Sequence, residues 1–76
     1  MIFMELSIYD MDLSVRAFNA LIRAGIQDVA SILAIDTYGE LREIKYLGQK
    51  IAADIISEMR RMGFDDWADR MDVDIK

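Results

Sequence analysis

The chain has no cysteine, no histidine and no proline among its 76 residues. Without cysteine, it has no disulfide framework, no thiolate nucleophile and no cysteine-based zinc site. Without histidine, it lacks the commonest general base near neutral pH and the commonest metal ligand. We therefore expect no catalytic residue, no metal, no cofactor and no small-molecule substrate. A small enzyme that works with carboxylates remains an alternative, but it would need Asp and Glu side chains that converge in a pocket.

Long apolar runs are also missing. No stretch approaches the ~20 apolar residues that are needed to span a bilayer. The opening Met1-Ile2-Phe3-Met4 lacks the charged start and the long apolar segment of a signal peptide. These absences predict a cytoplasmic protein with no membrane partner.

Positive charge is in short supply. The net charge is −5, and residues 65–76 contribute −3 of it, with five acidic residues against two basic ones. The other 64 residues hold nine acidic and seven basic residues, a net charge of −2. A nearly neutral body can carry a local basic face, but charge alone cannot make it bind nucleic acid strongly. The composition allows weak DNA binding at most.

Glycine is sparse, with only four residues in the chain, and 54% of the residues are hydrophobic. With no proline and with abundant Ala, Ile, Leu and Met, this composition predicts helices joined by short turns. We expect an all-α protein, a compact bundle of roughly four to five short helices with an extended N-terminal arm before it. Residues 1–76 should form a single domain with its core at about residues 10–64 and an acidic tail at residues 65–76.

The first helix is predicted to begin after Ser14, whose hydroxyl can cap the following turn. Apolar residues at three- and four-residue spacing then form one face, namely Val15, Phe18, Leu21 and Ile22. Gly25 should end this helix, because glycine adopts the left-handed conformation at little cost.

Three further helix starts can be read from the sequence. Asp28 can cap a second, short helix, and Thr37 can cap a third with Glu40 as its partner in a capping box. The longest helix is predicted between Gly48 and Gly63, and at ~1.5 Å per residue it would be about 22 Å long.

Two segments flank this predicted bundle. Residues 4–13 are expected to form an extended arm, although the alternation of Leu6, Ile8 and Met11 with polar residues leaves a β-strand open. Phe64 and Trp67 should fold back as a short cap over the core. The residues expected to be largely buried are Val15, Phe18, Leu21, Ile32, Leu41, Leu47, Ile55 and Met59.

Residues 20–26 and 41–52 each show a helix, a glycine-containing turn and a second helix. The second segment has helix-hairpin-helix spacing, with Gly48 at the turn. Glycine allows the backbone to approach a partner closely, and free amides at the next helix start can bind an anion. We therefore expect Gly25 and Gly48 in tight turns between helices. Ordinary antiparallel helix connections are the alternative explanation.

Arg16 falls in the first turn of the first predicted helix, where the helix dipole disfavours a cation. Asn19 is three residues further on and therefore shares its face. An arginine that enters the DNA minor groove, beside an asparagine that bonds the DNA backbone, would explain this pair. The alternative is a solvated arginine beside a surface asparagine, and spacing alone favours it.

Two motifs resemble those of a known family. The pattern L-[ST]-V-R-x-x-N is matched by Leu13, Ser14, Val15, Arg16 and Asn19, and the pattern Asn-Leu-Gly-x-Lys-Ser is matched by Leu47, Gly48 and Lys50. Both patterns are typical of the C-terminal domain of the bacterial RNA polymerase alpha subunit, which the protein resembles over roughly residues 10–64. The resemblance implies a non-catalytic helical domain that grips the minor groove of DNA and contacts transcription proteins.

The resemblance also implies a role for each matched residue. Arg16 would be the principal minor-groove residue, Asn19 would contact the DNA backbone, and Gly48 and Lys50 would belong to a second DNA-facing segment. In that segment Tyr46 replaces an asparagine of the family pattern, but its hydroxyl can still donate a hydrogen bond, so it stays a candidate DNA-binding residue. Ile51 replaces a serine whose hydroxyl could bond a phosphate. DNA binding should therefore be weaker than is usual for the family.

Asp10 and Asp12 match acidic positions that in the family touch the sigma factor. Stabilisation of the first helix by nearby acids is the alternative, and it suffices for Asp12. The expected partners are A·T-rich double-stranded DNA, bound weakly, and RNA polymerase components, a sigma factor or transcription regulators. The main alternative is a helix-hairpin-helix protein–protein interaction module that has lost DNA binding, which is favoured by the pI of 4.4, Tyr46 and Ile51.

Overall fold

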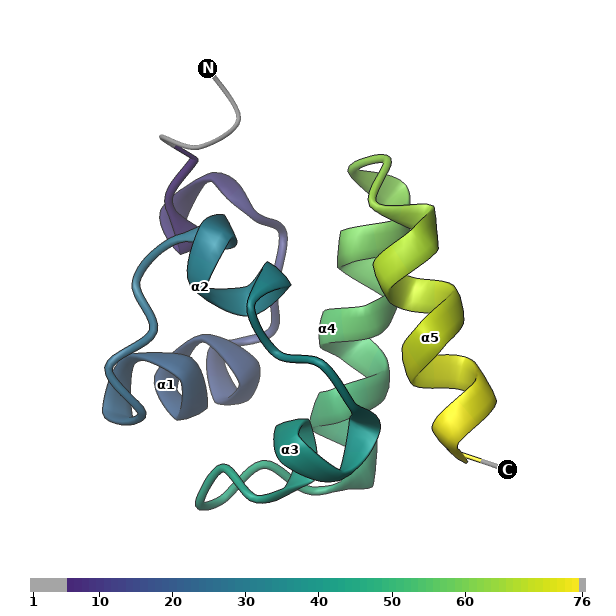
Figure 1. Ribbon diagram of the computed structural model, residues 1–76. Coiled ribbons are helices and arrows are strands. Elements are labelled where there is room, and N and C mark those ends of the chain that lie inside the picture. Colours follow the sequence, from purple (N-terminus) through teal and green to yellow (C-terminus); the bar gives the residue numbers. More distant parts are fainter. Residues whose placement is uncertain (1–5, 76) are drawn as a thin grey trace.

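The computed structural model describes residues 6–75, and every regular element in that range is helical (Figure 1). In chain order the elements are the 3-10 turn η2 (Ile8–Asp10), α1 (Val15–Arg23), α2 (Val29–Leu33), α3 (Tyr38–Arg42), α4 (Gln49–Arg61) and α5 (Asp65–Ile75). The predicted all-α class is confirmed. Over the described range, none of these helices combines the length and the apolar character that crossing a membrane requires.

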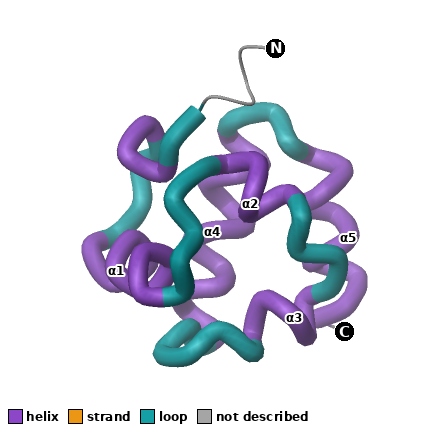
Figure 2. The backbone as a smooth tube through the Cα atoms, turned by 60° about the vertical axis from the view of Figure 1, so that its left-hand side comes forward, coloured by secondary structure: helices purple, strands orange, loops and turns teal. Residues whose placement is uncertain are grey.

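Helix α4 is the central element of the bundle. Both views place it between α1 on one side and α5 on the other (Figure 1, Figure 2). The short helix α3 packs against both α4 and α5. The loop of residues 43–48, which joins α3 to α4, lies beneath α3 in Figure 1 and beneath α1 in Figure 2. This path brings the start of α4 to the same side of the molecule as α1.

The predicted helix starts are capped as their sequences indicate. The Ser14 side chain accepts a hydrogen bond from the Ala17 amide at 3.2 Å. Asp28 accepts from the Ser31 amide at 2.8 Å, and Thr37 accepts from the Glu40 amide at 3.1 Å. The Glu40 carboxylate accepts from the amide of Asp36 at 2.8 Å, one residue before the position that a capping box would use.

Glycine ends α1 and α4 in the same way. Gly25 has φ +81°, and its amide donates to the Ile22 carbonyl at 3.0 Å while the Ile26 amide donates to the Leu21 carbonyl at 2.9 Å. These two bonds form a Schellman motif, which satisfies carbonyls that the helix end would leave free. The equivalent bonds surround Gly63 at the end of α4. The prediction that Gly25 lies in a tight turn between helices is confirmed.

The core contains most of the residues predicted for it. Those that are buried are Leu21, Ile32, Leu41, Leu47, Ile55 and Met59, and Phe18 is half-buried. The prediction for Val15 is wrong, because this residue is 74% exposed. Helix α1 instead turns Ala17, Ala20 and Leu21 inward. Val15 is two residues, or about 200°, from Ala17 and therefore points away from the core.

The flanking segments contribute more to the core than was expected. From residue 6 onward the predicted arm contains the turn η2 and a single isolated bridge between Ser7 and Asp28, and Ile8 is fully buried; residues 4 and 5 lie outside the described range. At the other end, the expected short cap is an eleven-residue helix, α5, which buries Trp67 and Met71. The buried core therefore includes residues on both sides of the range 10–64.

Candidate nucleic-acid interface

The exposed face of α1 carries a stripe of polar residues at helical spacing. Arg16, Asn19 and Arg23 share this face, because residues three, four and seven positions apart lie on one side of a helix. All three line a shallow hollow of about 300 Å³, whose lining is completed by Ala20, Tyr46 and Ile51. The hollow therefore joins α1, the loop of residues 43–48 and the first turn of α4.

The start of α4 forms the second part of the surface. Gly48 is the residue before the helix, its backbone is extended, and the first turn receives no cap from a side group. Gly48, Gln49 and Lys50 are all exposed. The leading amides of a thirteen-residue helix, together with the positive end of its dipole, suit an anion such as a phosphate. Lys50 adds a full positive charge beside them.

Two carboxylates of α4 fix the position of α1. Asp54 accepts a hydrogen bond from the Ser14 amide at 3.0 Å, and Glu58 accepts one from the Asp12 amide at 2.7 Å. Asp54 and Glu58 are four residues apart and therefore lie on one face of α4. They hold the segment that enters α1. Since Arg16 follows directly, these bonds set where it stands relative to the start of α4.

Glu58 can serve in this way because it is itself paired. The residue is only 5% exposed, and its carboxylate receives two hydrogen bonds from the Arg61 guanidinium, at 2.8 and 2.6 Å. The Arg61 hydrogen bond lowers the pKa of the Glu58 carboxyl, burial opposes that effect, and the Asp12 amide adds to it. The carboxylate therefore stays charged at neutral pH.

Tyr46 is an unusual member of the surface. Its φ is +69°, and it is the only described residue other than glycine with a positive φ. This conformation costs a residue with a Cβ atom roughly 1–2 kcal/mol, whereas asparagine tolerates it better. Tyr46 is 64% exposed, so burial does not offset the cost. Two cations do contact its ring, Arg23 with its Cζ 5.5 Å from the ring centroid and Lys45 with its Nζ at 5.2 Å. At exposed sites each contact contributes about 0.5–1 kcal/mol.

The structure thus places the predicted residues in two groups. Arg16, Asn19 and Tyr46 line one hollow. Gly48 and Lys50 lie at the start of α4, and their neighbour Ile51 lines the same hollow. Arg23 and Lys45 were not singled out in the sequence. The seven-residue spacing between Arg16 and Arg23 could have indicated that Arg23 shares the face of Arg16. No sequence pattern indicated Lys45, because its position depends on how its loop folds.

Asp10 and Asp12 lie just before α1 and belong to a different part of the surface. The Asp10 carboxylate accepts from the Ser7 amide at 2.9 Å and completes a capping box on η2. Asp12 is exposed. Two large apolar residues stand near them in the sequence, Tyr9 and Val15, both strongly exposed. The Tyr9 ring packs edge-on against Phe18, with the ring centroids 5.0 Å apart.

The negative charge of the protein is concentrated elsewhere. Helix α5 exposes four acids, Asp65, Asp66, Asp69 and Asp72, and α4 separates it from α1 (Figure 1). Arg60 of α4 pairs with Asp69 at 2.8 Å and with Asp72. The net charge of −5 is therefore compatible with a locally positive surface at the hollow.

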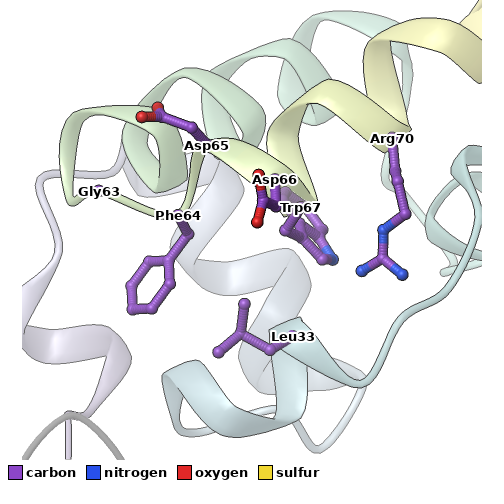
Figure 3. A pocket seen from close by; sticks show the side chains of 7 residues that line it. All are labelled: Leu33, Gly63, Phe64, Asp65, Asp66, Trp67 and Arg70. Carbon is purple, nitrogen blue, oxygen red and sulfur yellow. The ribbon is translucent and has the colours of Figure 1, made fainter.

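A second hollow, of about 500 Å³, opens where α5 begins. Figure 3 shows Phe64 and Leu33 pointing toward each other across it, with Trp67 beside them and Arg70 at its edge. The Trp67 indole N–H is already engaged, since it donates to the Ile35 carbonyl at 2.9 Å. Among the described residues, no three His, Cys, Asp or Glu side chains are grouped so that they could hold a metal ion. This hollow lies apart from the predicted DNA-facing residues.

Comparison with known proteins matches residues 2–61 to the family described as the C-terminal domain of the alpha chain of bacterial RNA polymerase. The protein belongs to this family. The match ends at the last residue of α4, so it includes the hollow, the start of α4 and the acids before α1. Helix α5 lies beyond the matched residues.

Individual relatives agree with the family assignment. The chain is 46% identical over 56 residues to a protein named DNA-directed RNA polymerase subunit alpha from Synechococcus elongatus, a stretch that covers 74% of the chain and 18% of the relative. The proteins of the same name from Fusobacterium nucleatum and Carboxydothermus hydrogenoformans are 38% and 39% identical over 80% and 78% of the chain. The chain spans only 18% of the length of each of these relatives.

Proposed function

We propose that this protein binds the minor groove of A·T-rich double-stranded DNA weakly and contacts transcription proteins through a separate surface. The observation that supports the DNA-binding role is the hollow to which α1 supplies Arg16 and Asn19 while the exposed, uncapped start of α4 lies beside it. The role is one of binding, with no reaction and no cofactor.

Each residue has a defined task in this proposal. The Arg16 guanidinium enters the minor groove, which is narrow and strongly negative in A·T-rich duplex. Asn19, one turn further along α1, bonds the sugar–phosphate backbone. Lys50 and the amides after Gly48 meet a neighbouring phosphate.

The interface is small, so binding should be weak. Ile51 supplies no hydroxyl to the hollow, and residues 1–64 carry a net charge of −2. With roughly two or three phosphates contacted, the logarithm of the affinity should fall with the logarithm of the salt concentration with a slope of about −2 to −3.

A salt-dependent titration with an A·T-rich duplex tests the DNA-binding role. We expect wild type to bind at low salt and Arg16→Ala to abolish binding, because the groove contact is lost. Arg70→Ala is the matched control, since it removes the same charge from an exposed position of α5, and it should leave binding unchanged. Equal loss in both variants would show that only net charge matters and would contradict the groove contact.

Contact with transcription proteins is proposed for the surface before α1. Asp10 and Asp12 supply negative charge there, and the exposed Tyr9 and Val15 supply apolar area, a combination that fits a partner segment with basic and apolar side chains. A sigma factor or a transcription regulator is the proposed partner. If wild type fails to bind duplex at low salt and Arg16→Ala weakens a protein complex instead, the domain is an interaction module that has lost DNA binding.

A further inference from the structure

The most distinctive group on this surface is the cluster formed by Tyr46 with Arg23 and Lys45. The two cations come from different elements, the last turn of α1 and the loop of residues 43–48, and both stand over one exposed ring. Among the described residues, no carboxylate forms an ion pair with either cation. Two like charges gathered on one ring without an acid between them favour an anion as the missing partner.

The spacing along α1 indicates where that anion would lie. Arg23 follows Arg16 by seven residues, which places it about 10.5 Å further along the same face of the helix. The minor groove is only about 6 Å wide. If Arg16 lies in the groove, a residue about 10.5 Å further along the helix lies outside it, beside the phosphates of the bordering strand and not beside the base edges. Arg16 and Arg23 line the same hollow, and Tyr46 lines it with them.

We propose that Arg23 and Lys45, held over the Tyr46 ring, form a phosphate-binding clamp on the strand that borders the groove occupied by Arg16. Tyr46 is a positioning residue in this clamp, because it orders both cations and need not touch DNA itself. The inference rests on the proposed DNA-binding function. It gives a reason for a tyrosine in a left-handed backbone position where the family pattern has asparagine.

The test is the salt dependence of binding to the A·T-rich duplex, measured on the whole chain. Arg23→Ala and Lys45→Ala should each reduce the magnitude of the slope of log affinity against log salt by about 0.9, the value for one phosphate contact. Arg42→Ala is the matched control, because Arg42 stands over Tyr38 in the same way, 5.8 Å from its ring centroid, but on α3 and outside the hollow. It should leave the slope unchanged.

Two substitutions separate the ring of Tyr46 from its hydroxyl. Tyr46→Phe keeps the ring and should keep the wild-type slope. Tyr46→Asn removes the ring but keeps a residue that tolerates positive φ, so it adds no backbone strain. Its salt slope should fall toward that of Arg23→Ala. A neutral hydrogen bond releases no counterion, so an equal fall in both variants would mean that the hydroxyl and not the ring orders the two cations, and the proposed role of the ring would be wrong.

The outcomes distinguish this inference from the function on which it rests. Loss of binding in Arg16→Ala with an unchanged slope in Arg23→Ala and Lys45→Ala overturns the clamp and leaves the groove contact intact. Absence of binding by wild type at low salt overturns both. Reduced slopes in the two clamp variants, with wild-type behaviour in Arg42→Ala, support the clamp.

Discussion

A single buried carboxylate, Glu58, links two parts of the protein that are far apart in sequence. It accepts from the Asp12 amide, 46 residues away, and from the Arg61 guanidinium one turn along its own helix. A hydrogen bond to a charged group contributes more to stability than a neutral one. We therefore expect Glu58 to stabilise the fold mainly through the negative charge of its carboxylate.

We expect Glu58→Gln to lower the free energy of unfolding by about 1–3 kcal/mol, because a buried charged acceptor is replaced by a neutral one. Urea denaturation at neutral pH measures the loss. Glu43→Gln, the same change at an exposed position, is the control and should stay within about 0.5 kcal/mol of wild type.

Lowering the pH should remove the difference between wild type and Glu58→Gln. The folded-state pKa of Glu58 is lowered, so its contribution is fully present above the unfolded-state pKa of about 4.3 and is lost as the pH falls through the folded-state value. Parallel decline of both proteins through the acid range would show that the Arg61 pair adds no stability.

At the level of elements, α5 is as much a part of the core as the helices before it. It turns Trp67, Ala68 and Met71 inward, and the Trp67 indole reaches back to the Ile35 carbonyl in the link between α2 and α3. Asp65, Asp66, Asp69 and Asp72 are on the outer face, and the acids of the first turn also suit the positive end of the helix dipole.

Met71→Ala should therefore destabilise the domain by about 2–5 kcal/mol, the usual cost of emptying a buried methionine site. For a domain of this size that corresponds to a fall in Tm of about 10 °C or more. Val73→Ala, on the same helix but 71% exposed, provides the control and should melt close to wild type. Similar melting of the two variants would mean that α5 is dispensable for folding.

Features that depend on local chemistry could be predicted from the sequence. Ser14, Asp28 and Thr37 cap their helices, and Gly25 and Gly63 end theirs, because each of these bonds spans only a few residues. The matched motif likewise predicted Arg16 and Asn19 as surface residues.

Features that depend on packing could not be read in this way. The inner face of α1 is made by Ala17 and Ala20, whose small side chains give a weaker hydrophobic signal than the outward-facing Val15. The segment of α5 is so rich in acids that its buried residues were not recognised as a helix face. The role of Arg23 depends on the path of a distant loop beneath α1.

For the molecule as a whole, the acids of α5 are kept apart from the cations at the hollow. Helix α4 lies between α5 and α1 (Figure 2), and α1 supplies part of the lining of the hollow. One helix is about 10–12 Å across, which exceeds the screening length of about 8 Å at physiological salt. The acids of α5 should therefore have little effect on a ligand at the hollow.

Neutralising two of these acids tests the separation. We expect Asp65→Asn combined with Asp66→Asn to change affinity for the A·T-rich duplex by less than about twofold at physiological salt, and to leave the salt slope unchanged. The same titration used for Arg16→Ala measures it. Many-fold tighter binding would instead show that DNA runs over α5.

The bonds from Asp54 and Glu58 to the segment before α1 have one more consequence, for how the domain can open. The Ser14 and Asp12 amides are tied to α4 across 40 and 46 residues, so both bonds break when the segment before α1 separates from α4. Their hydrogen exchange should follow the opening of the whole domain and not local breathing. The segment that carries Arg16 would then unfold together with the rest of the domain. In that case the binding residues are correctly placed only while the whole domain is folded.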